Sequence, residues 1–227
     1  MQMKKILLMI FALLSTASIC NAQILRAEEL EKYAKEKFGD NWTDAAINLS
    51  KTLNLDKNNA LTISQVIEVP NKSKQDIYIL LNYWYSSTFN DANSVIQLND
   101  KESGVIIAQG YVADIARHTG GMNRYIVNLS PIIKCDIKEG KARITYTVPF
   151  YSVTKAAGGG LLFGPGNQVI KQQNWVLDEC FPFAKKDSHK QVSSKALVMA
   201  YAYSNVLMDK IEECIKNGMN GNESDDW

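Results

Sequence analysis

One stretch of this chain, residues 73–110, constrains the fold most, because its hydrophobic pattern changes from helical to extended within a single segment. Its first part carries one apolar stripe at helical spacing, formed by Ile77, Leu80, Leu81 and Trp84. Ser73 is placed to cap this helix, and Asp76 to favour the positive end of its dipole. Residues 94–99 and 105–112 then predict two strands joined by a polar turn. A helix and two strands are not stable alone in water, so the stripe requires a wider sheet.

Strands that would supply this sheet are predicted on both sides of the helix. Strand-like segments at 52–55 and 60–69 precede it. After it, residues 124–137 are extended, with Pro131 indicating an edge position or a bulge. Residues 142–150 alternate apolar and polar side chains, as a half-buried strand does. The pattern predicts an α+β fold, in which an antiparallel sheet has helices on one face.

The segments around this central domain differ from it in composition. Two amphipathic helices are expected near the start, at 26–38 and 44–51, the second capped by Thr43. A loop is expected at 117–121. The predicted organisation is a signal peptide at 1–22, an N-terminal helical extension at 23–58, the α+β domain at 59–154, a Gly-rich irregular loop at 155–187, a C-terminal helix at 188–218 and a disordered acidic tail at 219–227.

The first residues predict export. Two lysines precede a short apolar run, and small residues follow it, as in a secretory signal peptide. Cleavage is expected after Ala22, which gives a periplasmic or secreted protein with no transmembrane segment. Lipidation at Cys20 is an alternative, although Ile19 stands where a lipobox prefers a small residue. An uncleaved membrane anchor is the weakest of the three interpretations.

Charge and cysteine content narrow the class of partner. The formal charge of +1 becomes about −1 without the leader, which argues against a nucleic-acid or anionic-membrane partner. Three cysteines would remain, and an odd number does not make a disulfide framework. Cys135 alternates with apolar neighbours and is expected to be buried. A bond between Cys180 and Cys214 stays open, because geometry cannot be read from sequence.

No residue pattern predicts catalysis, a cofactor or a metal. The two histidines, His118 and His189, are expected on the surface, and no zinc-binding or serine-hydrolase motif occurs. Asp56 begins a segment like a calcium loop, but Leu61 stands at its glycine position and Ile67 at its glutamate position. A polar hairpin turn is therefore expected there.

Candidate contact residues come from two places. The tip of the Gly-rich loop is apolar, and two tyrosines of the central helix would line a sugar or peptide groove if they faced outward. The candidate contact surface is Leu161, Leu162, Phe163, Tyr83 and Tyr85.

Several short motifs point to a known family. They are Ala22-Gln23 at the end of the leader, Trp84 and Thr88-Phe89 in the central helix, Ile96-Gln97 in a strand, and the late turn Lys138-Glu139-Gly140-Lys141-Ala142-Arg143. Together they resemble the secreted bacterial family called domain of unknown function 4468, over roughly residues 61–154. The resemblance implies a TBP-like fold, a curved antiparallel sheet with helices on one face. It implies no activity, so it transfers no catalytic residue.

The leading hypothesis is a non-enzymatic binding or adaptor module of the cell envelope, with an unknown envelope protein or glycan as its partner. Its expected contact surfaces are the sheet face away from the helices and the irregular loop. An envelope hydrolase that uses Cys180 or a carboxylate is the alternative, and it requires a thiol pKa below its usual value or a carboxyl pKa above it. A purely structural domain is the third hypothesis.

Overall fold

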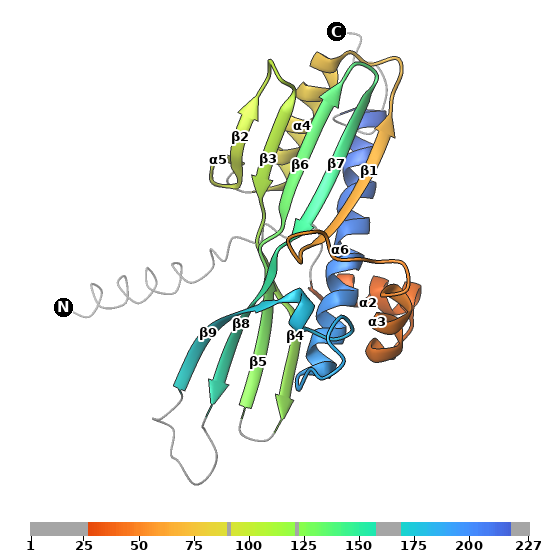
Figure 1. Cartoon of the computed structure of the whole chain (residues 1–227). Coiled ribbons are helices and arrows are strands. Elements are labelled where there is room, and N and C mark those ends of the chain that lie inside the picture. The colour runs from red at the N-terminus through yellow and green to blue at the C-terminus, as the bar shows by residue number, and fades with distance from the viewer. Residues whose placement is uncertain (1–26, 90–91, 121–122, 158–168, 219–227) are drawn as a thin grey trace, which may run out of the picture.

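The computed structural model describes residues 27–89, 92–120, 123–157 and 169–218, and it shows two antiparallel sheets placed end to end beside one long helix (Figure 1). The helices are α2 (Ala27–Phe38), α3 (Trp42–Leu49), α4 (Lys74–Thr88), the short α5 (Ala92–Val95) and α6 (Lys190–Asn217), with one 3-10 turn, η1 (Leu177–Glu179). The strands are β1 (Leu61–Glu68), β2 (Ile96–Asp100), β3 (Val105–Gln109), β4 (Val112–Gly120), β5 (Asn123–Leu129), β6 (Ile132–Lys138), β7 (Lys141–Val148), β8 (Phe150–Ala157) and β9 (Val169–Val176).

The two sheets are halves of one strand arrangement. One has the order β1-β7-β6-β3-β2 and the other the order β4-β5-β8-β9. The chain passes from β3 into β4, from β5 into β6 and from β7 into β8, so each pair crosses from one sheet to the other. β6 lies between β3 and β7, just as β5 lies between β4 and β8. Three long strands therefore run through the molecule and are interrupted at the same level.

Gly110, Pro131 and Pro149 occupy these interruptions. Proline has no backbone N–H to donate to a strand ladder, so hydrogen bonding between strands stops there. The N–H of Gly110 donates to the carbonyl oxygen of Pro131 at 2.9 Å, which ties two of the interruptions together. The sequence predicted one extended segment across Pro131, and the structure divides it into β5 and β6.

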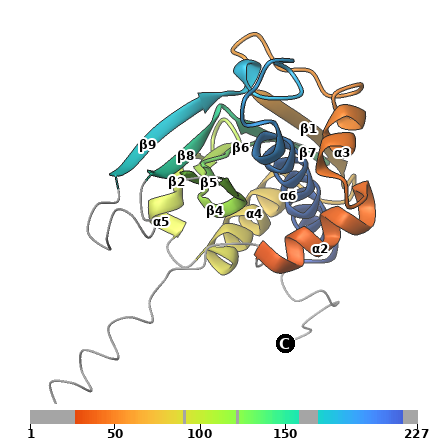
Figure 2. The ribbon, with the colours of Figure 1, turned by 90° about the horizontal axis from the view of Figure 1, so that it is seen from below.

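The helices cover one face of the sheets, as the sequence predicted (Figure 2). α4 contacts β6 and β7, while α6 contacts β1 and β7 of one sheet and β4 and β5 of the other. α2 and α3 contact α6. α6 is therefore central, and it buries side chains on several faces because it has sheets on one side and helices on others.

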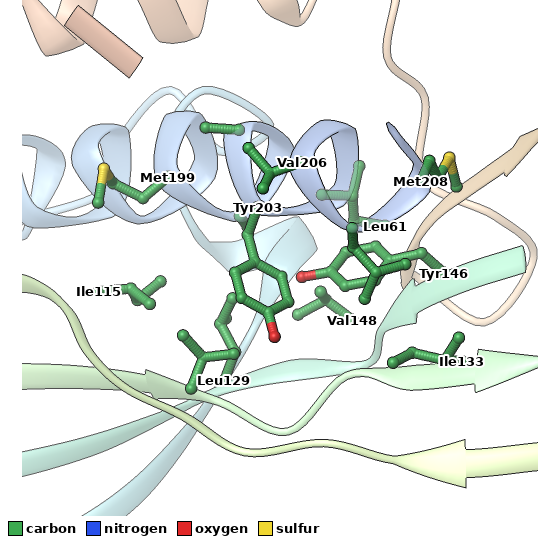
Figure 3. Packing of buried hydrophobic residues seen from close by; sticks show 14 of the residues in the cluster. Leu61, Ile115, Leu129, Ile133, Tyr146, Val148, Met199, Tyr203, Val206 and Met208 are labelled. Atoms are coloured by element: carbon green, nitrogen blue, oxygen red, sulfur yellow. The ribbon is translucent and has the colours of Figure 1, made fainter. Parts of the chain in front are cut away.

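The core continues across the joint between the sheets. Tyr203 of α6 lies between Leu129 of one sheet and Tyr146 of the other, and all three are buried (Figure 3). The rings of Tyr203 and Tyr146 are 6.2 Å apart. Because one apolar cluster joins both sheets to α6, we expect them to unfold together.

The predicted cap of α4 is confirmed, and the predicted cap of α3 is wrong. The side chain of Ser73 accepts from the N–H of Asp76, and the Asp76 carboxylate accepts from the N–H of Ser73. α3 is capped by Asn41, whose side chain accepts from the N–H groups of Thr43 and Asp44. The predicted strand at 52–55 is also wrong, because only Leu55 pairs there, in an isolated bridge.

Two strands were missed where the sequence predicted loops. β4 occupies the segment where a loop was expected at 117–121, and a register shift between Val112 and Ala116 hides its alternation. β9 lies inside the segment predicted to be irregular, 155–187, and the four residues in its middle, 171–174, are polar and exposed because it is an edge strand. The leader, the acidic tail and the loop tip at 161–163 lie outside the described residues. Within the described ranges, no helix is both long enough and apolar enough to cross a membrane.

Candidate ligand-binding groove

Two adjoining pockets form a groove where the N-terminal end of α6 meets the four-stranded sheet. One pocket, of about 440 Å³, lies between the start of α3 and α6, and Trp42 lines it. The other, of about 750 Å³, lies against β5, and Tyr125 lines it. Three residues line both pockets: His118, Gln191 and Val192. We call the two pockets together the histidine groove, because both histidines of the chain line it.

Strand register builds one wall of the groove. His118 of β4 pairs with Tyr125 of β5, Tyr125 with Lys155 of β8, and Lys155 with Lys171 of β9. Directly paired residues of antiparallel strands point to the same face. This row therefore crosses the whole sheet on the side that carries the helices. The Nζ atom of Lys155 lies 5.6 Å from the centre of the Tyr125 ring, as the register requires.

An aromatic cluster fixes the ring of His189 at the edge of the groove. The His189 ring stacks on Trp175 with 4.5 Å between ring centres and 27° between planes. It meets the edge of Tyr125 at 4.8 Å. Trp175 comes from β9 and Tyr125 from β5, so the cluster joins two strands to the start of α6. A planar ring supported in this way loses little rotamer freedom on binding a ligand.

Asp187 holds the backbone beneath this cluster. Its carboxylate accepts hydrogen bonds from the N–H of Phe181 at 2.9 Å, the N–H of His189 at 2.6 Å and the hydroxyl of Ser193 at 2.5 Å. Only 6 % of the Asp187 side chain is exposed. The carboxylate is therefore used by the fold, and it organises the turn before α6.

The arrangement of Ser188, His189 and Asp187 differs from that of a catalytic triad. The hydroxyl oxygen of Ser188 lies 3.2 Å from Nδ1 of His189, and Oδ1 of Asp187 lies 3.5 Å from the same nitrogen. A triad uses one ring nitrogen for the nucleophile and the other for the carboxylate. Here both oxygens lie near Nδ1, so no proton relay runs from serine through the ring to aspartate.

Two cations beside the groove are neutralised by carboxylates. Lys195 binds Glu31 of α2 at 2.6 Å, and Arg117 is paired with Asp114. Burial alone would raise the pKa of Glu31, but the hydrogen bonds from Lys195 and Lys35 outweigh it and hold the pKa below its ordinary value. Lys195 also lies 5.5 Å from the centre of the Trp42 ring, which fixes this wall of the groove.

Three other lysines keep their charge available. Lys155, Lys171 and Lys190 form no ion pair with any described residue. Lys171 and Lys190 are exposed, while Lys155 is half-buried. Lys190 lies over the ring of Phe181 at 4.4 Å, so its ammonium group is held near the mouth of the groove. This end of the sheet therefore carries positive charge.

The cysteines are not activated. Burial raises the pKa of the Cys135 and Cys180 thiols to about 12, and it raises the pKa of Cys214. The hydrolase hypothesis required the opposite shift for Cys180. All three are free, so Cys180 and Cys214 are not bonded to each other, and Cys135 is buried as predicted.

The structure places the contact residues predicted from sequence in different environments. Tyr83 is partly exposed and lines a pocket of about 230 Å³ between α4 and the end of α6. Tyr85 was wrongly placed on the contact surface, because it is fully buried and its hydroxyl lies 3.5 Å from Sγ of Cys135. Burial raises its pKa well above the usual value. Leu161, Leu162 and Phe163 lie outside the described residues.

The sheet face away from the helices offers a weaker site. On the five-stranded sheet a hollow of about 210 Å³ lies beside Val66, which is 54 % exposed. Asp136 is its central charge, and it pairs with Lys134 at 2.7 Å and with Arg143 at 3.0 Å. These charges satisfy one another, so less remains for a partner than at the histidine groove.

Asp56 forms the polar turn that the sequence predicted. Its carboxylate accepts from the N–H groups of Asn58 and Ala60 and from the hydroxyl of Thr62, as in a polar turn. Among the described residues, no cluster of three or more potential metal ligands occurs.

Comparison with known proteins gives a match to one family model over part of the chain. Residues 64–151 match the family described as domain of unknown function (DUF4468) with TBP-like fold. No curated protein matches the chain in sequence.

Two solved structures are similar. One is a TBP-like protein from Parabacteroides distasonis ATCC 8503, at 13 % identity and a TM-score of 0.48, covering 72 % of this chain and 97 % of that one. The other is a DUF4468 family protein from Bacteroides ovatus ATCC 8483, at 13 % identity and a TM-score of 0.43, covering 74 % of this chain and 92 % of that one.

The family match includes β4 and β5 but ends before most of β8, β9 and α6. His118 and Tyr125 of the histidine groove fall inside it, whereas Lys155, Trp175 and His189 fall outside. Residues 64–151 of this chain thus match the model of the DUF4468 family, which is described as having a TBP-like fold.

Proposed function

We propose that this protein is a non-enzymatic binding or adaptor module of the cell envelope, and that the histidine groove holds its ligand. The single observation that carries the proposal is the groove itself, in which a supported aromatic ring, amide and hydroxyl side chains and the unpaired Lys190 meet in one concave site. The partner is an envelope protein or a glycan, and not a nucleic acid.

A binding role fits the chemistry of the groove better than hydrolysis. The thiols have raised pKa values, and the serine and aspartate share one nitrogen of His189. Asp187 makes three hydrogen bonds to the fold, which leaves it poorly placed as a general base. These features support a site that recognises a ligand without transforming it.

Export is part of the same proposal. The charged start, the short apolar run and Ala22 support removal of the leader, with Gln23 as the first residue of a periplasmic or secreted protein. Mass spectrometry of the protein from a periplasmic fraction would test this directly. A mature chain beginning at Gln23 is expected, and an intact leader or a lipid on Cys20 would contradict it.

Crosslinking from inside the groove tests the binding role. Gln191 lines both pockets and is exposed, so a photoreactive amino acid at this position would face a bound ligand. The matched control is the same substitution at Gln97, an exposed residue of β2 in the other sheet. Irradiation of intact cells is expected to give adducts from position 191 and not from position 97. Equal labelling at the two positions, or none at 191, would overturn the proposal.

A further inference from the structure

We infer that the ligand of the histidine groove is an acidic oligosaccharide. The inference rests on the proposed binding role and adds the chemical class of the ligand. Three properties of the groove carry it: the polarity of its lining, its supported planar rings and its unpaired positive charge.

The lining suits a polar ligand with many hydroxyl groups. Amide and hydroxyl side chains face both pockets, and they can both donate and accept hydrogen bonds. They are Thr43, Asn123, Ser188 and Gln191, together with Asn41, whose side chain already caps α3. An apolar ligand would leave the amide groups of Asn123 and Gln191 without partners, which costs free energy for each group that is buried. A sugar chain carries several hydroxyl groups on each unit, and these can form hydrogen bonds with the amide and hydroxyl groups of the lining.

The rings suit the flat C–H face of a sugar. His189 is held by Trp175 and Tyr125, and its side chain is 32 % exposed, so one part of the ring remains open to the groove. Trp42 lines the neighbouring pocket, and Lys195 lies over its ring. The two rings lie in adjoining pockets, so a chain of several sugar units is a better fit than a single ring.

The charge around the groove favours an anion. Arg117 and Lys195 are paired with carboxylates of this chain, but Lys155, Lys171 and Lys190 have no such partner among the described residues. Asp40 is the carboxylate that lines the first pocket. Lys190 lines the second pocket, and Lys155 lies beside it over the ring of Tyr125, so this end of the groove carries unpaired positive charge. A carboxylate or sulfate group on a sugar would form charge-assisted hydrogen bonds with these two lysines.

The unpaired lysines beside the groove are too few to neutralise the phosphates of a nucleic acid. Affinity for nucleic acids depends on neutralising many successive phosphates, and the whole chain has a formal charge of only +1. A single-stranded DNA oligonucleotide therefore serves as a competing outcome in the test.

Affinity electrophoresis of the full chain tests the inference with three acidic polysaccharides: polygalacturonate, alginate and hyaluronan. Highly methyl-esterified pectin is the matched neutral probe, because it shares the backbone of polygalacturonate without most of its charge. At least one acidic polymer is expected to retard the protein in low salt, with retardation falling as salt rises. If polygalacturonate is the polymer that binds, pectin should retard the protein far less.

Substitutions locate the binding. Lys155→Gln and Lys190→Gln are each expected to weaken retardation about three- to tenfold. Lys101→Gln, in the exposed β2–β3 turn at the opposite end, is the control and should leave it unchanged. An equal effect of Lys101→Gln would overturn the inference, because the binding would then be a general effect of charge.

The remaining outcomes separate this inference from the proposed function. Equal retardation by pectin and polygalacturonate would overturn the acidic ligand and leave a neutral glycan in the groove. Tighter binding of the DNA oligonucleotide, or no retardation by any acidic polymer, would also overturn the inference. Crosslinking at position 191 then decides the binding role on its own, because adducts there would preserve the proposed function whatever the ligand.

Discussion

The two sheets share three long strands, but their helix-side faces differ. In the five-stranded sheet, β7 buries Ala142, Ile144 and Tyr146 completely beneath the helices. In the four-stranded sheet, β8 buries Tyr151 and Val153, yet the next residue on this face is Lys155. At this level Tyr125, the partner of Lys155 in the sheet, contacts His189, the residue that precedes α6. A concave site therefore forms where the strands of the four-stranded sheet extend beyond the helices that cover them.

The largest expected effect concerns the boundary on β8 between the buried Val153 and the half-buried Lys155. Val153 and Lys155 are two residues apart on one strand and one face, but only Val153 is fully buried. Val153→Asp would bury a carboxylate without a partner and is expected to destabilise the fold by at least about 3 kcal/mol. Lys155→Asp should change stability by less than about 0.5 kcal/mol. Urea unfolding followed by circular dichroism measures both, and equal losses would show that the boundary is misplaced.

A smaller loss is expected at the closed end. Leu81 of α4 is fully buried, and Leu81→Ala removes side-chain volume from a core that cannot collapse completely around it. The expected loss is about 2–5 kcal/mol. Ile79→Ala on the exposed side of the same helix is the matched control, with a change within about 0.5 kcal/mol. Similar losses for the two variants would mean that α4 does not pack as described.

The cap of α4 should contribute less than its buried stripe. Ser73→Ala removes the acceptor for the N–H of Asp76 and is expected to cost about 1 kcal/mol, measured by urea unfolding at neutral pH. Ser86→Ala, near the other end of the same helix, is the control and should be neutral or slightly stabilising. If the two variants behaved alike, the capping box would have no energetic role.

Acid should weaken the same cap. Hydrogen bonds from the side chain and backbone of Ser73 hold the pKa of Asp76 below its usual value. Since the folded pKa is below the unfolded one, the stabilisation is present above the unfolded pKa and is lost as pH falls through the folded pKa. Asp76→Asn should therefore lower the melting temperature at pH 7 and not near pH 2. A constant difference at both values would contradict the assignment.

The smallest expected effect concerns reactivity, with no change in stability. Cys135 lies in the closed sheet and Cys180 beneath the open one, yet burial raises the pKa of each to about 12. Both should resist a thiol reagent at pH 8 in the folded protein and react after denaturation. Half-buried Cys214 should react at an intermediate rate. Rapid reaction of Cys180 alone would show that the open end exposes its core, and it would revive the hydrolase alternative.

The closed end was largely predictable from sequence, and the open end was not. The stripe, the cap and the polar turns of the segment from Ser73 to Gly110 depend on residues close in the chain, where periodicity and turn chemistry are informative. β4 and β9 were missed because one carries a register shift and the other is a polar edge strand. Local patterns are ambiguous in both cases.

The histidine groove was missed for a different reason. His118 and His189 were each interpreted as surface residues, because one lies before two glycines and the other at the lysine-flanked start of a helix. Their meeting depends on the register of β4 with β5 and on the position at which α6 begins, and both are tertiary properties. A polar end to otherwise apolar strands, as in Val153 followed by Lys155, was the one local signal available.

α6 follows all the described strands in sequence, and this order has a consequence for biosynthesis. Lys195 of α6 forms an ion pair with Glu31 of α2, and Glu212 of α6 accepts a hydrogen bond from Gln65 of β1. α6, which is synthesised late, therefore contacts segments that are synthesised early. The ribosome delivers the strands before the element that covers them. The nascent chain therefore holds its apolar sheet faces exposed until α6 has been synthesised, and we expect it to depend on chaperones until α6 packs.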